Sequence, residues 1–169
     1  KGNTHLLLVI CLILASCGKQ QHEVLIEAES FKDKGGWVVD PQFVEQMGSP
    51  YLLAHGMGTP VENAKTEINI ESTGKYYVWV RTKNWAKGNW EAPGKFRLLI
   101  NSNELEETLG TGDEKWIWQY AGRVSIKEAS VDIELKDLTG FEGRCDAVYM
   151  STVKKAPPYA ADELSTWRK

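Results

Sequence analysis

From residue 24 onward, apolar and polar side chains alternate in several short runs. The clearest run, residues 64–71, places Ile68 and Ile70 on one face and charged or amide side chains on the other. Alternation with a period of two is typical of a strand with one buried face. A turn at residues 72–74 and an aromatic-rich run at 75–83 come next. The composition of this stretch therefore predicts a hairpin.

Further strands are expected along the rest of the chain, at residues 96–100, 124–126, 131–136 and 145–153. The last of these runs is apolar on both faces, as a central strand would be. Gly, Pro, Asn and Asp recur between the runs at the spacing of a sandwich or barrel, and no useful helical period precedes Ala160. The pattern predicts an all-β fold, most economically a β-sandwich.

The first residues have a different pattern, in which Lys1 precedes an unbroken apolar run at residues 6–15. Crossing a hydrocarbon core of about 30 Å takes roughly 20 apolar residues in a helix, so this run is too short to span a membrane. Its layout is that of a signal peptide. Residues 14–17 also resemble the bacterial lipobox, which implies cleavage before Cys17 and attachment of a lipid to it. An ordinary signal peptide with a chance cysteine is the alternative.

These patterns divide the chain into four segments. We expect a signal peptide at 1–16, a lipidated tether at 17–23, a β-sandwich domain at 24–155, and a linker at 156–169 that either opens a further element or ends as a short tail. The expected location is the cell envelope, with the exported chain anchored by lipid on the periplasmic or outer-membrane face.

Charge and cysteine content argue against two properties, nucleic-acid binding and an internal disulfide. Lys and Arg number 20 against 23 for Asp and Glu, so the chain lacks the basic excess that nucleic-acid binding uses. Removal of the signal and lipidation of Cys17 would leave Cys145 as the one thiol, which excludes an internal disulfide. Cys145 lies in an apolar run and is expected to be a buried small hydrophobe.

Catalytic signatures are missing from the sequence: it has no glycine-rich phosphate loop, nucleophile elbow or paired histidines at metal spacing. His55 is interpreted as a loop residue. An enzyme that uses His55 with a Glu or Asp is the alternative, but a lone imidazole needs partners to orient it. The domain is therefore interpreted as non-catalytic.

Tryptophan is the informative excess, with seven residues in one modest domain. Trp79 and Trp118 lie in strand-like runs and are expected to fill the core. Trp85 and Trp90 lie in a stretch of loop composition. They either fold back to cap one end of the sandwich or present a platform for a ligand.

Arg81 and Asn84 lie close in sequence to the second pair of tryptophans and complete the candidate contact set, which is Trp85, Trp90, Arg81 and Asn84. Aromatic faces stack on the C–H faces of sugar rings, while polar neighbours bind the hydroxyl groups. This combination of residues favours a glycan as the ligand.

A second constellation combines acidic residues of the first and last strands. Alternation places Glu27 and Glu29 on one face, and Asp146 lies just after Arg144 near the end of the domain. Hard oxygen ligands of this kind suit a structural Ca²⁺. An ion pair between Arg144 and one of the acids, or simple solvation of the carboxylates, is the alternative.

Residues 26–31, 77–81 and 145–149 resemble the jelly-roll carbohydrate-binding modules of families 6 and 35. That resemblance implies a jelly-roll sandwich, a glycan partner, and a structural Ca²⁺ held at the positions of Glu27, Glu29 and Asp146.

Residues 35–40, 48–56 and 138–146 resemble the N-terminal β-sandwich domain of secreted FAD-dependent oxidoreductases of Bacteroidetes-like bacteria. In those proteins a glycine-rich fingerprint opens the next domain, which holds the flavin, and this chain contains no such fingerprint, so no flavin site is assigned. We therefore expect a lipid-anchored glycan-binding or accessory module. The alternative is a scaffolding domain that packs on a downstream oxidoreductase domain outside this chain.

Overall fold

The structure is a computed structural model that describes residues 20–86, 88 and 91–157. Its elements, in chain order, are β1 (Glu23–Glu27), a 3-10 turn η1 (Ala28–Ser30), β2 (Val38–Asp40), α1 (Val44–Met47), β3 (Tyr51–His55), β4 (Ala64–Asn69), β5 (Gly74–Thr82), β6 (Phe96–Ile100), β7 (Asn103–Glu104), β8 (Ile117–Ile126), β9 (Ser130–Asp137) and β10 (Phe141–Ser151).

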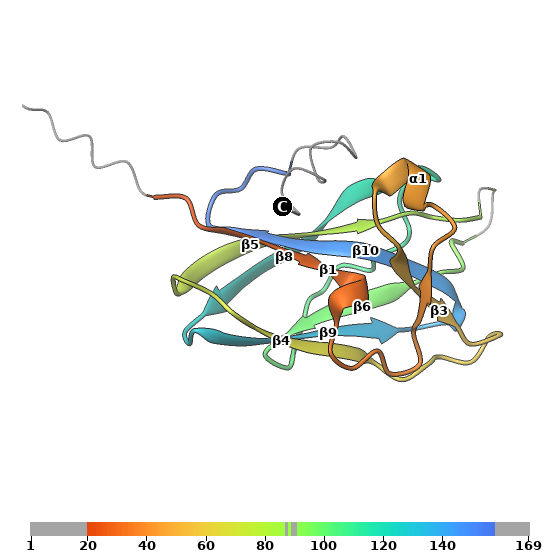
Figure 1. Cartoon of the computed structure of the whole chain (residues 1–169), viewed down its shortest axis with the longest axis horizontal. Coiled ribbons are helices and arrows are strands. Elements are labelled where there is room, and N and C mark those ends of the chain that lie inside the picture. Colours follow the sequence, from red (N-terminus) through yellow and green to blue (C-terminus); the bar gives the residue numbers. More distant parts are fainter. Residues whose placement is uncertain (1–19, 87, 89–90, 158–169) are drawn as a thin grey trace, which may run out of the picture.

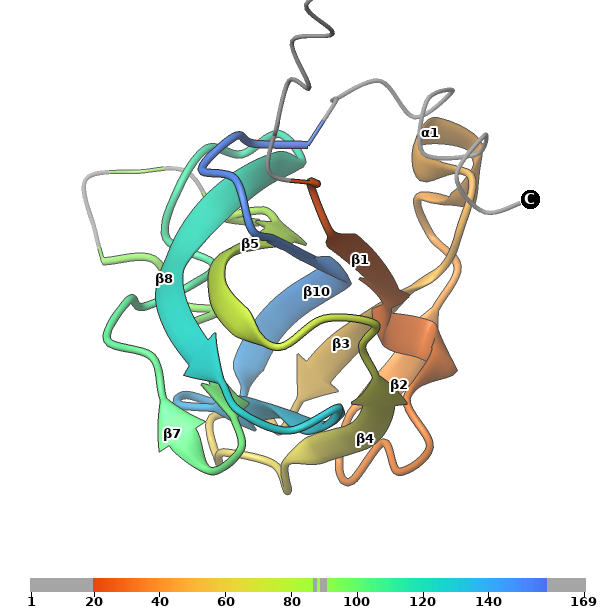
Figure 2. The same ribbon diagram turned by 90° about the vertical axis from the view of Figure 1, so that its left-hand side faces the viewer.

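The strands form two antiparallel sheets that enclose one core (Figures 1 and 2). The six-stranded sheet has the order β2-β3-β10-β5-β8, with β1 also paired to β10, and the four-stranded sheet has the order β4-β9-β6-β7. Strand β10 lies between β5 on one side and β1 and β3 on the other. From Gly143 to Ser151 its residues are buried on both faces, which confirms the central strand expected at residues 145–153, although the strand ends at Ser151.

In the four-stranded sheet, alternate residues face the core, as predicted. Phe96, Leu98 and Ile100 of β6 are fully buried, as are Ile133 and Leu135 of β9, and the residues between them are more exposed. Burial of each such side chain stabilises the fold by about 1.5–3 kcal/mol. The predicted all-β sandwich is confirmed.

The predicted hairpin of residues 64–83 is wrong. Strand β4 pairs with β9, whereas β5 pairs with β8 and β10, so the turn at 71–73 carries the chain from one sheet to the other. Ile70 and Tyr76, on either side of this turn, both face the same core. Alternation identifies the buried face of each strand but not its neighbour, and here the two faces meet across the sandwich.

Two short helical segments interrupt regions that were expected to be extended or irregular. Strand β1 ends at Glu27, and the next three residues form η1, where the Ser30 hydroxyl donates to the Glu27 carbonyl (2.6 Å). Glu29 is therefore not on the strand, and the predicted shared face of Glu27 and Glu29 is wrong. The four-residue helix α1 ends at Gly48, which adopts the left-handed conformation at φ 78°.

Trp79 and Trp118 are buried, as expected, but not between the sheets. They pack with Ala147 and Tyr149 in a second cluster, which we call the outer-face cluster. Trp79 alternates with Val78 and Val80, which point into the main core, so the cluster lies on the opposite face of the six-stranded sheet. Ala156, beyond β10, packs against it.

The described chain enters and leaves the domain at neighbouring positions. His22 and Thr152 are joined by backbone and side-chain hydrogen bonds, including the Thr152 N–H to the His22 carbonyl (3.0 Å). In Figure 1 both segments lie at the left, while the loops after β3, β5 and β9 lie at the right. No helix among the described residues has the length and apolar content needed to cross a membrane.

Candidate ligand-binding site

Three loops meet at the end of the sandwich opposite His22 and Thr152: residues 56–63, the described residues of 83–95, and residues 138–140. The Gly140 carbonyl accepts the backbone N–H groups of both Gly56 and Gly58 (3.0 and 3.2 Å). The Thr139 hydroxyl donates to the Pro93 carbonyl (2.6 Å). The short turn after β9 thus holds the two longer loops in place.

Asp137, the last residue of β9, connects two of these loops, 56–63 and 138–140, through its side chain. Its buried carboxylate accepts the backbone N–H groups of Val61 (2.9 Å), Thr139 (3.1 Å) and Gly140 (2.9 Å). Hydrogen bonds to an ionised acceptor are about twice as strong as neutral ones. This carboxylate therefore gives the loop end a fixed shape.

Two exposed aromatic residues stand on this base, and we call them the aromatic platform. Trp85 is 40% exposed and Phe141 is 50% exposed. The Trp85 indole N–H donates to the Phe141 carbonyl (2.8 Å), which fixes the indole to the start of β10. Gly58, at φ +90°, lies against the Phe141 ring, where an added Cβ would be 3.0 Å from Cζ. The exposed Met57 precedes it.

A row of polar side chains runs beside the platform. The Arg144 guanidinium lies 5.5 Å from the centre of the Trp85 ring and 3.2 Å from a carboxylate oxygen of Glu142. The other Glu142 oxygen lies 3.3 Å from Nδ1 of His55. The Arg144 side chain is only 8% exposed, whereas His55 is exposed. The row thus leads from a buried cation to a solvent-facing imidazole.

The backbone of Glu142 creates this arrangement. Glu142 has φ 59°, and the register between β10 and β3 shifts between Phe141 and Gly143. A left-handed non-glycine residue in a bulge redirects the side chains of its neighbours and is costly unless the surroundings hold it. The loop end keeps a strained residue beside its exposed aromatic groups.

A further cation lies near Arg144. The Lys83 ammonium is 4.5 Å from the centre of the Phe43 ring. Burial and the nearby Arg144 guanidinium lower the pKa of Lys83, while Glu114 acts in the opposite direction.

Three of the four predicted contact residues are described by the structure, and they do not all lie together. Trp85 and Asn84 lie together, with the side-chain oxygen Oδ1 of Asn84 accepting the Ala86 N–H (3.2 Å) in a local turn. Trp90 lies outside the described residues. Arg81 does not reach the platform, because its buried side chain lies 3.3 Å from the Asp146 carboxylate. Its role as a glycan contact stays a prediction, and the loop-end platform is described without it.

The Ca²⁺ site expected at Glu27, Glu29 and Asp146 stays a prediction. Asp146 is fully buried, and its carboxylate binds the Ser49 hydroxyl (2.9 Å) as well as the Arg81 guanidinium. No three His, Cys, Asp or Glu side chains within residues 20–86, 88 and 91–157 gather as a metal site. The guanidinium of Arg81 provides the positive charge at Asp146. The alternative ion pair was misplaced, since Arg144 pairs with Glu142.

Sequence reasoning missed Phe141 and Met57 as surface groups. Local residue types gave no signal for Phe141, because its position depends on the left-handed backbone of Glu142. Cys145 was assigned correctly: it is buried, and burial raises the pKa of its thiol well above the usual value. Its position gives no support to thiol chemistry.

No protein-family model matches the sequence, and no curated protein matches it significantly. Solved structures do resemble the fold. A family 35 carbohydrate-binding module from Clostridium thermocellum is 17% identical with a TM-score of 0.59, covering 76% of this chain and 96% of the module. The CBM36-1 domain of a xylanase from a Trinervitermes trinervoides hindgut metagenome is 13% identical with a TM-score of 0.58, covering 80% and 99%.

A larger enzyme shows the same fold as one part. The Podospora anserina GH26-CBM35 β-(1,4)-mannanase is 19% identical with a TM-score of 0.61, and the match covers 82% of this chain but only 29% of the mannanase. These likenesses confirm the predicted jelly-roll class. The resemblance to oxidoreductase N-terminal domains stays a prediction.

Proposed function

We propose that this chain is a non-catalytic carbohydrate-binding module whose ligand site is the loop end built on Trp85 and Phe141. The observation that carries the proposal is the state of Trp85. Its indole is exposed yet fixed, with its N–H bound to the Phe141 carbonyl and Arg144 over its ring. A large aromatic group held rigidly in solvent suits stacking, because little side-chain entropy remains to be lost on binding.

Two kinds of contact would recognise a sugar at this site: stacking on its ring face and hydrogen bonds to its hydroxyl groups. The C–H face of a pyranose would lie on the indole, and the Glu142 carboxylate and His55 imidazole would bind its hydroxyl groups. Arg144 is held by Glu142 and orients that carboxylate (3.1 Å to its carbonyl, 3.2 Å to its side chain). A site with so few contacts predicts weak affinity for a single sugar and better retention on a polymer.

The lipid anchor and the accessory role belong to the same proposal. The apolar run before Cys17 supports attachment of the module to the cell envelope. A Cys17→Ser variant should then move from the detergent phase to the aqueous phase on phase separation, and retention in the detergent phase would contradict the anchor.

A scaffolding role is the second candidate. The described chain leaves the domain over the outer-face cluster, where Ala156 packs. A downstream domain, such as the predicted oxidoreductase, would therefore begin beside an aromatic surface. In the mannanase, too, the matched region is one part of a longer chain.

Affinity electrophoresis of the chain in gels containing mannan, xylan or galactan tests the proposed function. Trp85→Ala and Phe141→Ala should each weaken retention by about tenfold, the effect of one binding anchor. Val39→Ala removes an exposed apolar side chain from β2 and serves as the matched control. Unchanged retention of the two variants, or free migration of the parent in all gels, would leave the scaffolding role as the better account.

A further inference from the structure

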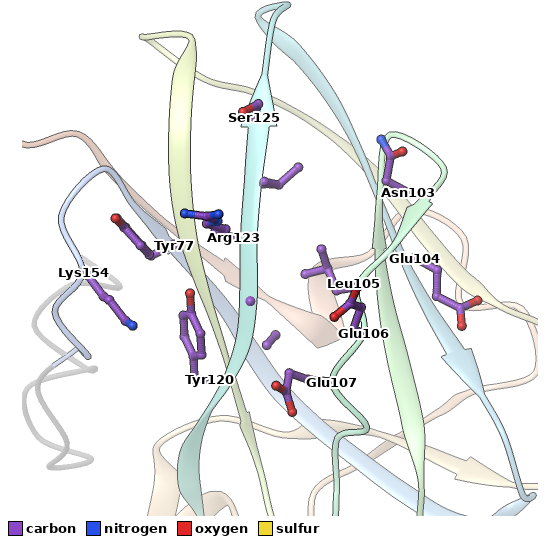
Figure 3. Close-up of a pocket in the computed structure, with 13 residues that line it drawn as sticks. Tyr77, Asn103, Glu104, Leu105, Glu106, Glu107, Tyr120, Arg123, Ser125 and Lys154 are labelled. Atoms are coloured by element: carbon purple, nitrogen blue, oxygen red, sulfur yellow. The ribbon is translucent and has the colours of Figure 1, made fainter.

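A second groove, of about 800 Å³, runs along the edge strand β8 (Figure 3). Its walls include Tyr77, Tyr120, Arg123 and Lys154 on one side of β8, and Glu106 and Glu107 on the other. Tyr77 lies five residues before the end of β5 at Thr82, or about 17 Å along the strand. The groove is therefore separate from the loop-end site.

Two tyrosine rings form the aromatic part of the groove. Tyr77 and Tyr120 are half-buried, and their centres lie 6.5 and 5.3 Å from that of the buried Trp79. Because Trp79 belongs to the outer-face cluster, the two rings rest on a packed base. Tyrosine combines an apolar face with a polar end, which suits contact with the C–H face and hydroxyl groups of a sugar.

Hydrogen-bonding groups border these rings. Arg123 lies opposite Tyr77 in the pairing of β5 with β8, and the Lys154 ammonium lies 5.1 Å from the centre of the Tyr120 ring. Burial and Tyr77 raise the pKa of Tyr120, Arg123 lowers it, and Glu107 raises it. Charges of both signs thus act on Tyr120.

The charges of the groove are balanced. Glu104 at its rim is already bound by two cationic side chains at 2.6 and 2.7 Å. Exposed Arg123 and Lys154 lie on one side of β8, and exposed Glu106 and Glu107 lie on the other. Neither an anion nor a cation is favoured by such a set, whereas hydroxyl groups, which both donate and accept, can use all of it.

The edge of β8 and a local clamp define the length of the groove. In the described part of the chain, β8 pairs with β5 alone, so its other edge presents backbone groups to the groove. At one end the Gln119 side chain donates to the Thr108 carbonyl (2.8 Å) and accepts the Gly110 N–H (3.2 Å). This clamp joins β8 to the segment after β7.

We infer that the β8 groove is a second carbohydrate site and that it takes an uncharged oligosaccharide lying along the strand. This site goes beyond the loop-end function and has its own residues. Two separate sites on one module would raise retention on a polysaccharide through effective concentration, without tight binding at either site.

Isothermal titration of the full chain with mannohexaose, xylohexaose and β-1,3-galactotriose tests this inference. Two sites per chain are expected with at least one of these probes. Arg123→Ala and Tyr77→Ala should weaken one site by about tenfold, and Trp85→Ala should weaken the other. Arg123 is exposed, so its variant reports on binding even if loss of Tyr77 disturbs packing. Lys65→Ala is the control, in a smaller groove without aromatic lining residues.

Each outcome separates the two proposals. A single site that responds to Trp85→Ala but not to Arg123→Ala or Tyr77→Ala would overturn the β8 site and keep the loop-end function. A single site with the opposite response would keep the β8 site and remove the loop-end function. Absence of binding to all three neutral probes would overturn the β8 site.

Discussion

The guanidinium of Arg81 lies 3.3 Å from the carboxylate of Asp146, and both side chains are almost completely removed from solvent. Strands β5 and β10 supply the two residues, and the Ser49 hydroxyl donates to the second carboxylate oxygen (2.9 Å). The pair therefore joins the strand that leads to the Trp85 loop with the strand that carries Phe141.

Removal of one partner should be costly. Arg81→Met would leave the Asp146 carboxylate buried without its cation, so we expect the free energy of unfolding to fall by about 3–5 kcal/mol. Urea denaturation measures this loss. Arg81→Met combined with Asp146→Leu should recover most of it, because the buried charge is then gone as well. A loss below about 1 kcal/mol in the single variant, the range of exposed pairs, would contradict this account of the pair.

Chelation should leave the fold unchanged. Because the Asp146 carboxylate already has a cationic partner, we expect the melting temperature to be the same in EDTA and in excess Ca²⁺. Differential scanning calorimetry in the two buffers checks this expectation. Stabilisation by Ca²⁺ that Asp146→Asn abolishes would show instead that the residue binds the metal.

Alternation alone predicted most of the strands, because a strand with one buried face shows apolar and polar side chains in turn along its sequence. It could not predict that β4 and β5 belong to different sheets, since both bury a face in the same core. Nor could it separate a strand from the 3-10 turn at Glu29, where the acidic and apolar residues still alternate.

The site was predictable in part. Trp85 could be identified as a candidate ligand contact because it is a large aromatic residue in a stretch of loop composition. The burial of Arg81 was not predictable, because nearness in sequence to Trp85 does not reveal its tertiary partner, Asp146. Phe141 depends on the unusual backbone of Glu142, which local residue types do not indicate.

The Asp137 carboxylate should control the shape of the loop end. Asp137→Ala removes the acceptor of three backbone N–H groups, so we expect a loss of about 3 kcal/mol in unfolding free energy together with weaker glycan retention. Asp137→Asn keeps one acceptor oxygen and should lose less. Urea denaturation and affinity electrophoresis measure the two effects. Equal stability of Asp137→Ala and the parent would exclude this structural role.

Alkaline pH should destabilise the domain through two tyrosines. Burial, with a hydrogen bond to Asp40, raises the pKa of Tyr51 to about 12, and burial with a hydrogen bond to Glu23 does the same for Tyr149. An unfolded tyrosine has a pKa of about 10, so between about pH 10 and about pH 12 the folded state holds more protons than the unfolded state. The free energy of unfolding therefore falls as pH rises through that window.

Thermal melts across this pH range, monitored by circular dichroism, measure the alkaline effect. The fall in melting temperature should be smaller in Tyr149→Phe, which has no proton to lose. A melting temperature that stays constant through the window, or the same slope in both proteins, would argue against the two tyrosines as its cause.

The indole resonance of Trp85 reports on the loop-end site itself. In ¹H–¹⁵N spectra it can be assigned by its loss in Trp85→Phe, and the indole of Trp37, buried in the main core, provides the internal reference. We expect a polysaccharide fragment retained by the parent chain to shift the Trp85 resonance in a saturable way while the Trp37 resonance does not move. A Trp85 resonance that does not move while the fragment binds would contradict the loop-end site.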